Sequence, residues 1–384
     1  MTPGSDVVDV TVTLQQPASL LREVLFRADV ERLSDFSGEG NVAVEDQHVR
    51  WQPPAAGGEL RWRARVPHMR TNGGYDAWLG LDWGLFRAED IIPRAATRTR
   101  KGAQSETRWS FRLPARWSVI TQYYNRDGQF FANDAKRRFD QPTGWVAIGR
   151  LGVRRETIAG VRVAVAGPVQ HALRRLDMLA LLHWTLPELA RILPELPRRL
   201  TIVSAADPMW RGGLSAPQSL YIHSERPLIS ENGTSTLLHE LLHVALDLRA
   251  KPGHDWIIEG LAEFYSLELL RRSGTISASR HRAALDELRD WARSSRRLCG
   301  SRSTGATTAR AVGIFVRLDR EIRDDSNGAS GLDDVIRALV DDGAPIGLEE
   351  LAASVRHFTT GNPDALRIND LPGCRKIMTS TRED

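Results

Sequence analysis

The most constraining feature of this 384-residue chain is an apolar helical stretch, Thr236–Leu246, that two histidines and a glutamate interrupt. His239, Glu240 and His243 have the spacing H-E-x-x-H. Residues four apart lie one above the other on a helix, so the histidines share a face with Glu240 beside them. The surrounding leucines indicate a buried helix. Burying two imidazoles and a carboxylate is costly unless a metal ion or another partner compensates them.

The histidine pair has the chemistry of a zinc site. Neutral imidazoles suit zinc, and a carboxylate beside a zinc-activated water can accept that water's proton. We therefore predict His239 and His243 as metal ligands and Glu240 as the general base. The motif alone also permits a second interpretation, in which the match is a coincidence and both histidines lie in a core with their hydrogen bonds satisfied.

A catalytic zinc site has three protein ligands and keeps a position for water. Metzincins continue with glycine and then histidine or aspartate where this chain has Leu246 and Arg249, which excludes that class. A second helical pattern follows at 255–265, and in it Glu259 is the predicted third ligand. Glu263, one turn later, is predicted to hydrogen-bond the other nitrogen of a ligand histidine. Otherwise both are solvated surface carboxylates.

The segments H-E-L-L-H (239–243) and W-I-I-E-G-L-A-E-F-Y (256–265) resemble the gluzincin metallopeptidases. The resemblance is to the glycyl aminopeptidase-like family M61 in particular, and more distantly to the aminopeptidase N family. A Gly-Gly-Leu stretch at 212–214 and Leu-Pro-Ala-Arg-Trp at 113–117 also carry it. It covers most of the chain, without the C-terminal PDZ domain common in that family. It implies a peptidase with one Zn²⁺ per chain and a peptide or protein substrate.

The resemblance also implies a substrate cleft bordered by Gly213, Leu214 and Ser215, and a hydrogen-bond donor to the oxyanion of the tetrahedral intermediate. The tyrosine that the family usually provides has no counterpart at 307–313. The donor would then be one of four side chains, each of which can equally be structural: Tyr221, His223, His254 or Tyr265.

Ser215 stands where that family has the carboxylate that anchors the substrate's amine. A serine provides no opposing charge, and charge-assisted hydrogen bonds are roughly twice as strong as neutral ones. We therefore expect no strict requirement for a free N-terminus, and the choice between aminopeptidase and endopeptidase stays open. Two other functions stay open: a catalytically impaired binding protein of the same fold, and a zinc hydrolase of non-peptide amides or esters.

Composition restricts the class of protein. Hydrophobic residues make up 41% and charged residues 26%, which is typical of a soluble globular protein. The net charge of +4 comes from scattered arginines, and no basic helix with interleaved aromatics is visible, so we expect no nucleic-acid partner. No apolar run is long enough to cross a bilayer. We expect a cytoplasmic protein, or a periplasmic or secreted one if a signal peptide was removed before residue 1. Cys299 and Cys374 are either bridged or two thiols.

The pattern of periodicity predicts an α+β fold in three domains. Alternation at 8–14, 60–66 and 109–113 indicates a β-sandwich over 1–167. Helical periodicity at 169–196, with buried strands at 200–203 and 219–223, begins a domain at 168–272 that the resemblance identifies as a thermolysin-like catalytic domain. A C-terminal α-helical domain is predicted over 273–384, with helices at 283–292, 311–322, 332–340 and 348–358.

Overall fold

The computed structural model describes residues 4–132, 141–367 and 371–374. Its contacts divide the chain into two compact units. The first comprises Met1–Arg155, Val163–Arg175 and Arg199–Glu225; the second comprises Glu156–Arg162, Leu176–Arg198 and Arg226–Asp384. Most strands belong to the first unit and most helices to the second, so the mixed α+β class is confirmed. The division into three domains stays a prediction.

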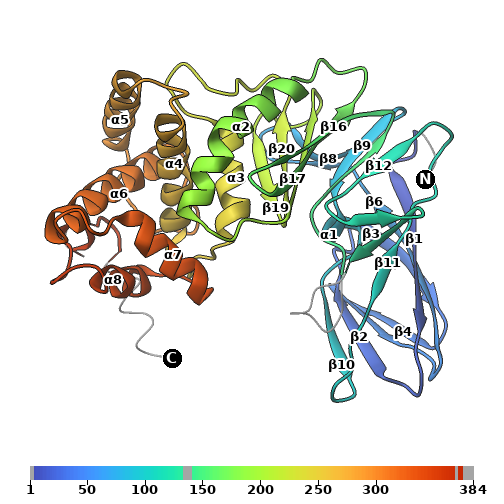
Figure 1. The fold of residues 1–384 in the computed structure, drawn as a ribbon. Coiled ribbons are helices and arrows are strands. Elements are labelled where there is room, and N and C mark those ends of the chain that lie inside the picture. Colours follow the sequence, from blue (N-terminus) through green and yellow to red (C-terminus); the bar gives the residue numbers. More distant parts are fainter. Residues whose placement is uncertain (1–3, 133–140, 368–370, 375–384) are drawn as a thin grey trace. The chain divides into compact units, whose positions relative to one another are not determined.

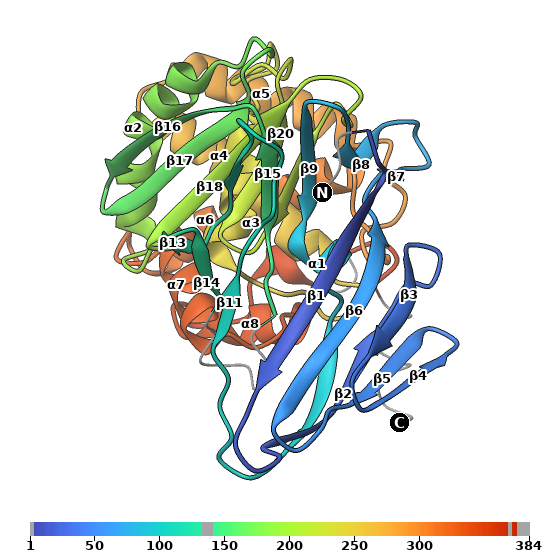
Figure 2. The same ribbon diagram turned by 90° about the vertical axis from the view of Figure 1, so that its right-hand side faces the viewer.

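Two antiparallel sheets of the first unit share one apolar core. Their strand orders are β1-β6-β3 and β10-β2-β5-β4, and Figure 2 shows β1 and β6 running side by side. In β6 the buried Leu60, Trp62 and Ala64 alternate with exposed arginines, as expected for a sheet with one buried face. Phe26 and Trp51 of the second sheet lie in the same core. The strands are β1 Val7–Gln15, β2 Leu21–Arg27, β3 Leu33–Gly38, β4 Asn41–Glu45, β5 His48–Gln52, β6 Gly57–Arg65 and β10 Ala95–Thr99.

The strand predicted at 109–113 is displaced, because β11 is Thr107–Trp109. Phe111 and Leu113 still pack against the apolar core, so the alternation there reflects burial without strand pairing. β11 belongs to a sheet with the order β11-β14-β13, and a further sheet of the first unit has the order β12-β15-β9-β8-β7. Their remaining elements are β7 His68–Met69, β8 Tyr75–Leu79, β9 Trp83–Arg87, α1 Ala88–Ile91, β12 Ser118–Ile120, β13 Tyr124–Arg126, β14 Gln129–Ala132 and β15 Trp145–Gly149.

A five-stranded sheet has the order β16-β17-β18-β20-β19. β18 and β20 are parallel, and β19 is antiparallel to β20 at the edge of the sheet. Every residue of β20 is buried, which agrees with the buried strand predicted there. The strands are β16 Leu151–Ile158, β17 Val161–Pro168, β18 Arg199–Ala205, β19 Gly213–Ala216 and β20 Ser219–His223.

The second unit is organised around α4, which contacts α3, α5 and α6 (Figure 1). This helix is apolar on nearly all sides and therefore buried, with Trp256, Leu261 and Phe264 in its core. A Cβ atom at Gly260 would lie 2.5 Å from the Cβ of Ala311, so glycine permits the close approach of α6. The helices are α2 Arg175–Ile192, α3 Thr236–Leu246, α4 Asp255–Arg272, α5 Ala278–Ala292, α6 Ala306–Asp325, α7 Leu332–Asp342, α8 Leu348–Arg356 and η1 Asp364–Leu366.

Two helices begin earlier than their apolar periodicity predicts. α5 begins at Ala278 because the Ser277 hydroxyl accepts a hydrogen bond from Arg280 N at 3.2 Å and caps it. α6 begins at Ala306, and its first five residues, ATTAR, include no large apolar side chain that a hydrophobic pattern would detect. Among the described residues no helix is long and apolar enough to span a membrane.

Cys299 and Cys374, whose state the sequence leaves open, form a disulfide. It joins the segment after α5 to residues 371–374, and Leu298 N also donates a hydrogen bond to Pro372 O at 2.8 Å. The two cysteines are 75 residues apart, so the bond constrains a long loop of the unfolded chain.

Candidate metal centre

Helix α3 carries the two histidines in a fixed position. Its N-cap is Ser235, whose buried hydroxyl accepts a hydrogen bond from Leu238 N at 3.3 Å. Leu237, Leu238, Leu241 and Leu242 are all buried and hold the helix by packing. The cap and the buried leucines therefore fix the helix backbone that carries both imidazoles.

Helix α4 is joined to the start of α3. The Ser266 hydroxyl of α4 donates a hydrogen bond to Ser235 O at 3.3 Å. Gly260, at the close contact with α6, immediately follows Glu259 and fixes that turn of the helix. Packing on both sides thus determines where Glu259 lies relative to the histidines.

The three predicted ligands come together in the second unit. His239 Nε2 and His243 Nε2 are 3.1 Å apart. His239 Nε2 lies 3.3 Å from Glu259 Oε2, and His243 Nε2 lies 3.5 Å from Glu259 Oε1. Among the described residues this is the group of three or more potential ligand side chains whose donor atoms are close enough to share an ion.

These separations fit a tetrahedral zinc ion. Zinc binds histidine nitrogen at about 2.0–2.1 Å and carboxylate oxygen at about 2.0–2.2 Å, which places the ligand atoms of a tetrahedron roughly 3.3–3.5 Å apart. The observed values of 3.1, 3.3 and 3.5 Å span that range. Three ligands leave the fourth position for water or substrate, as in catalytic zinc sites. The donor set therefore fits zinc in both chemistry and geometry.

Glu263 lies on the outer side of His239. Its Oε2 is 2.8 Å from His239 Nδ1. When Nδ1 carries a hydrogen and donates it to this carboxylate, the lone pair of Nε2 points into the cluster. Glu263 is therefore placed to set both the tautomer and the ring orientation of His239.

The charges of the cluster are strongly coupled. Burial disfavours the His239 imidazolium, but hydrogen bonds to Glu259 and Glu263 outweigh it and raise the pKa of His239 to about 10. Burial also opposes ionisation of Glu259, yet hydrogen bonds from both histidines lower its pKa to about 2. The cluster thus stabilises positive charge at the point where the ligand atoms meet.

Glu240 lies between the two histidines in the sequence of α3 and is 9% exposed. Its carboxylate is near enough to His239 to contribute to the raised pKa of that imidazole. The role of Glu240 as a general base stays a prediction, for which a buried carboxylate has the required chemistry.

Two of the four candidate oxyanion donors belong to the second unit. The Tyr265 hydroxyl donates a hydrogen bond to Asp333 Oδ1 at 3.0 Å, and burial raises the pKa of this phenol well above its usual value. The His254 ring donates from Nδ1 to Pro252 O at 3.1 Å. The Tyr265 hydroxyl is therefore already engaged within the helical unit, which favours a structural role for it.

The remaining predicted residues belong to the first unit. The Tyr221 hydroxyl donates to Trp210 O at 2.9 Å, and burial raises the pKa of this side chain. His223 is fully buried, and its Nδ1 accepts a hydrogen bond from Glu225 N at 3.3 Å. Gly213, Leu214 and Ser215 form most of the edge strand β19. One side of this strand is thus unpaired within its sheet.

The sequence analysis did not single out Asp255, the first residue of α4. Its Oδ2 accepts a hydrogen bond from Ser303 N at 2.6 Å, which ties the loop before α6 to the helix that carries Glu259. Burial, with a contribution from Glu259, raises the pKa of Asp255. The detectable signal was spacing, since Asp255 precedes Glu259 by one helical turn and shares its face.

Comparison with known structures concerns the fold. The chain is similar to the crystal structure of an aminopeptidase N family protein from Idiomarina loihiensis, with a TM-score of 0.68 and 16% sequence identity. The similarity covers 89% of this chain and 70% of that chain. Searches with protein-family models and against curated proteins give no match. At this identity the likeness shows a shared fold, which is that of an aminopeptidase-like protein.

Proposed function

We propose that this chain is a zinc-dependent peptidase of the gluzincin type, as the sequence resemblance to the glycyl aminopeptidase-like family implies. The observation that carries the proposal is the cluster of His239, His243 and Glu259, with separations of 3.1–3.5 Å. The aminopeptidase-like fold supports it independently of the motif. The metal is zinc by this account because two imidazoles and one carboxylate at tetrahedral spacing form a typical catalytic zinc set.

Zinc bound by these three side chains would act as a Lewis acid toward a scissile carbonyl and would lower the pKa of water. The protein's own contribution to proton transfer is Glu240. Its carboxylate accepts a proton from the attacking water and then delivers that proton to the leaving nitrogen. Burial beside His239 keeps Glu240 away from bulk solvent during this exchange.

Glu263 positions His239 and does not touch the substrate. By accepting the Nδ1 hydrogen at 2.8 Å it keeps Nε2 available as a ligand. Such carboxylates also make the imidazole a stronger electron donor. Removing Glu263 should therefore weaken metal binding before it affects any proton transfer.

The proposed substrate is a peptide with no strict need for a free N-terminus. The edge strand β19 has an unpaired side, to which an extended peptide can add by backbone hydrogen bonds. Ser215 on that strand provides no negative charge for a substrate ammonium group. A matched pair of peptides, N-acetylated and free, should therefore be cut at similar rates. A preference of about 100-fold or more for the free peptide would show that another acid anchors the amine.

A second candidate function is a binding protein that keeps the metal but has lost turnover. It is favoured by the hydroxyls of Tyr221 and Tyr265, because both already donate hydrogen bonds inside the protein. Without a tyrosine or an equivalent donor, stabilisation of the oxyanion is reduced.

A peptide-library digest analysed by mass spectrometry separates the two functions, with zinc content measured on the same samples. The peptidase proposal predicts cleavage by the wild-type chain and none by Glu240→Gln, with zinc in both. Zinc without cleavage by either protein would favour the binding function, and absence of zinc from both would overturn the metal site.

A further inference from the structure

Helices α5 and α6 enclose a groove whose charge is out of proportion to the rest of the chain. It has a volume of about 550 Å³ and an apolar floor that includes Leu288, Val312 and Ile314. Its arginines are Arg282, Arg289, Arg293, Arg310, Arg317 and Arg320. Against these six stands one acid, Asp286, which gives the lining a net charge of +5. The whole chain has a net charge of only +4, so this groove is a distinct site of positive charge.

The arginines form two rows along the groove. Within each helix they are spaced by seven, four or three residues, and these spacings keep them on one helix face. From Arg282 to Arg293 the row on α5 rises by roughly 16 Å at 1.5 Å per residue. That length matches about three turns of a helix lying in the groove.

Some of this charge lacks a partner within the protein. Arg289 pairs with Asp286 at 2.9 Å, and the Arg310 guanidinium donates to the carbonyl oxygens of Ala292 and Ser295. By contrast, the guanidinium groups of Arg282, Arg317 and Arg320 make no ion pair or hydrogen bond with any residue that the structure describes. Three cations on both sides of an apolar floor therefore remain available to a ligand.

Gly313 leaves open space above the floor. It is exposed near the middle of α6, and a Cβ atom built on it meets no atom within 4 Å. A glycine inside a helix is destabilising relative to alanine. At Gly260 the contact with Ala311 explains the residue, but no neighbour in the described chain explains Gly313. An occupant that approaches α6 closely would explain it.

We propose that this groove docks an acidic amphipathic helix of a partner protein. Apolar side chains at helical spacing would enter the floor, and glutamates or aspartates on the flanks would meet the arginine rows. The concave apolar floor disfavours a flat membrane surface. It also offers apolar contacts that an amphipathic helix uses and a phosphate backbone, bound by the arginines alone, does not.

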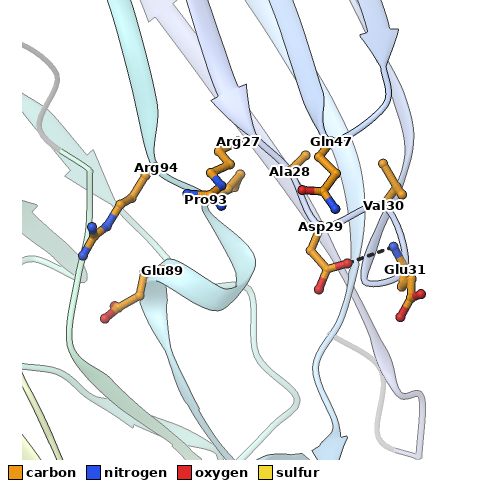
Figure 3. A pocket seen from close by; sticks show the side chains of 9 residues that line it. All are labelled: Arg27, Ala28, Asp29, Val30, Glu31, Gln47, Glu89, Pro93 and Arg94. Carbon is orange, nitrogen blue, oxygen red and sulfur yellow. Dashed lines mark hydrogen bonds between the residues drawn. The ribbon is translucent and has the colours of Figure 1, made fainter. Parts of the chain in front are cut away.

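A second hollow, in the first unit, shows that a concave surface alone does not produce such an excess of arginine. Figure 3 shows its lining, in which Arg27 and Arg94 are outnumbered by Asp29, Glu31 and Glu89. Its volume of about 610 Å³ is similar to that of the groove. Asp29 Oδ1 already accepts a hydrogen bond from Glu31 N at 3.1 Å. Of these two hollows, it is therefore the α5–α6 groove whose charge indicates a partner.

The test is binding of a fluorescent synthetic peptide of about 15 residues, with leucines at helical spacing and glutamates elsewhere. Anisotropy is measured with the full chain carrying Glu240→Gln, so that hydrolysis cannot consume the probe. A scrambled peptide of the same composition and anionic lipid vesicles are run in parallel. We expect saturable binding of the helical peptide that weakens with added salt, and at least tenfold weaker binding of the scrambled one.

Two groove variants and a matched control complete the design. Arg317→Glu with Arg320→Glu should raise the Kd by about tenfold or more, since both charges reverse. Gly313→Leu should also weaken binding by filling the floor, and it tests the groove even if the double variant fails to fold. The control, Arg154→Glu with Arg155→Glu at two exposed positions of β16, should change the Kd less than twofold.

Four results would overturn the proposal: no binding of the helical peptide, equal binding of the scrambled peptide, equal weakening by the control, or binding to vesicles in place of the peptide. Circular dichroism of each variant confirms that the helices are retained.

Discussion

Helix α4 contributes to two clusters of charge, one around the buried Glu268 and one around the half-buried Glu259, which compensate these carboxylates in different ways. The Glu268 carboxylate forms ion pairs with Arg271, Arg272 and His281, with N···O distances of 2.7, 3.1 and 3.2 Å. Glu259, nine residues earlier, is paired in the described structure with histidines alone. The first cluster contains permanent cations, and the second contains groups whose charge depends on a proton or a metal.

The consequence for function follows from that difference. Arginine stays protonated at all ordinary pH values, so the Glu268 cluster is complete and has no position for an ion. Arg272 also pairs with Asp333 at 2.7 Å, and Asp333 accepts a hydrogen bond from the Tyr265 hydroxyl. These two contacts link α4 to α7. A histidine can exchange its proton for a metal near neutral pH. The Glu259 cluster is thus built for exchange, and the Glu268 cluster for stability.

The largest expected effect comes from removing Glu240, the proposed general base beside the exchangeable cluster of His239, His243 and Glu259. Glu240→Gln should keep zinc but lower turnover by about 10²–10⁴-fold, since general-base catalysis typically contributes that much. Peptide hydrolysis and zinc content are measured on the same preparation. Wild-type turnover in this variant would remove the proposed mechanism.

A smaller effect is expected at the edge of the same cluster. Glu263→Ala should weaken zinc binding by about 10–100-fold, because the hydrogen bond that orients His239 is lost. Competition with a chromophoric chelator measures the affinity. Glu287→Ala on the exposed face of α5 is the matched control. Equal affinities for Glu263→Ala and the control would show that Glu263 does not act on the metal.

In the arginine cluster the effect should fall on stability alone. Glu268→Gln should destabilise the fold by about 2 kcal/mol at neutral pH, between the values for exposed and buried ion pairs, and should leave zinc affinity unchanged. Chemical denaturation provides the free energy of unfolding, with Glu287→Gln as the control. A loss of zinc binding without loss of stability would reverse our assignment of the two clusters.

The pH dependence of that loss has a definite sign. Burial opposes ionisation of Glu268, but His281 and the two arginines hold its pKa well below the usual range. A lowered pKa contributes stability above the unfolded value, and this contribution is lost as the pH falls toward the folded value. The difference between wild type and Glu268→Gln should therefore be full at neutral pH and shrink below the ordinary glutamate range near 4. A difference that grows on acidification would contradict it.

The exchangeable cluster was largely predictable, whereas the arginine cluster was not. His239, His243, Glu259 and Glu263 belong to two short helical patterns, and helical spacing places each pair on one face. The Tyr265–Asp333 hydrogen bond joins residues 68 positions apart, so no local pattern contains it. For the same reason the sequence could not decide whether Cys299 and Cys374 are bonded.

The groove between α5 and α6 illustrates the same limit. Its arginines appear scattered along the sequence, and the low net charge gives no sign of them as a group. They form two rows only when the two helices pack together. Charge patterns that depend on the packing of separate helices are therefore hidden from composition.

The central claim is that His239, His243 and Glu259 bind one zinc ion together. The most direct measurement is calorimetric titration of zinc into the metal-stripped chain, in neutral buffers of different ionisation enthalpy. Burial opposes the His239 imidazolium, but hydrogen bonds to Glu259 and Glu263 raise the pKa of His239 and favour the protonated ring in the absence of metal, so we expect zinc binding to release a proton. We predict about one equivalent of zinc with proton release, and at least about 100-fold weaker binding by Glu259→Ala. No binding by the wild-type chain, or unchanged affinity in Glu259→Ala, would contradict the account.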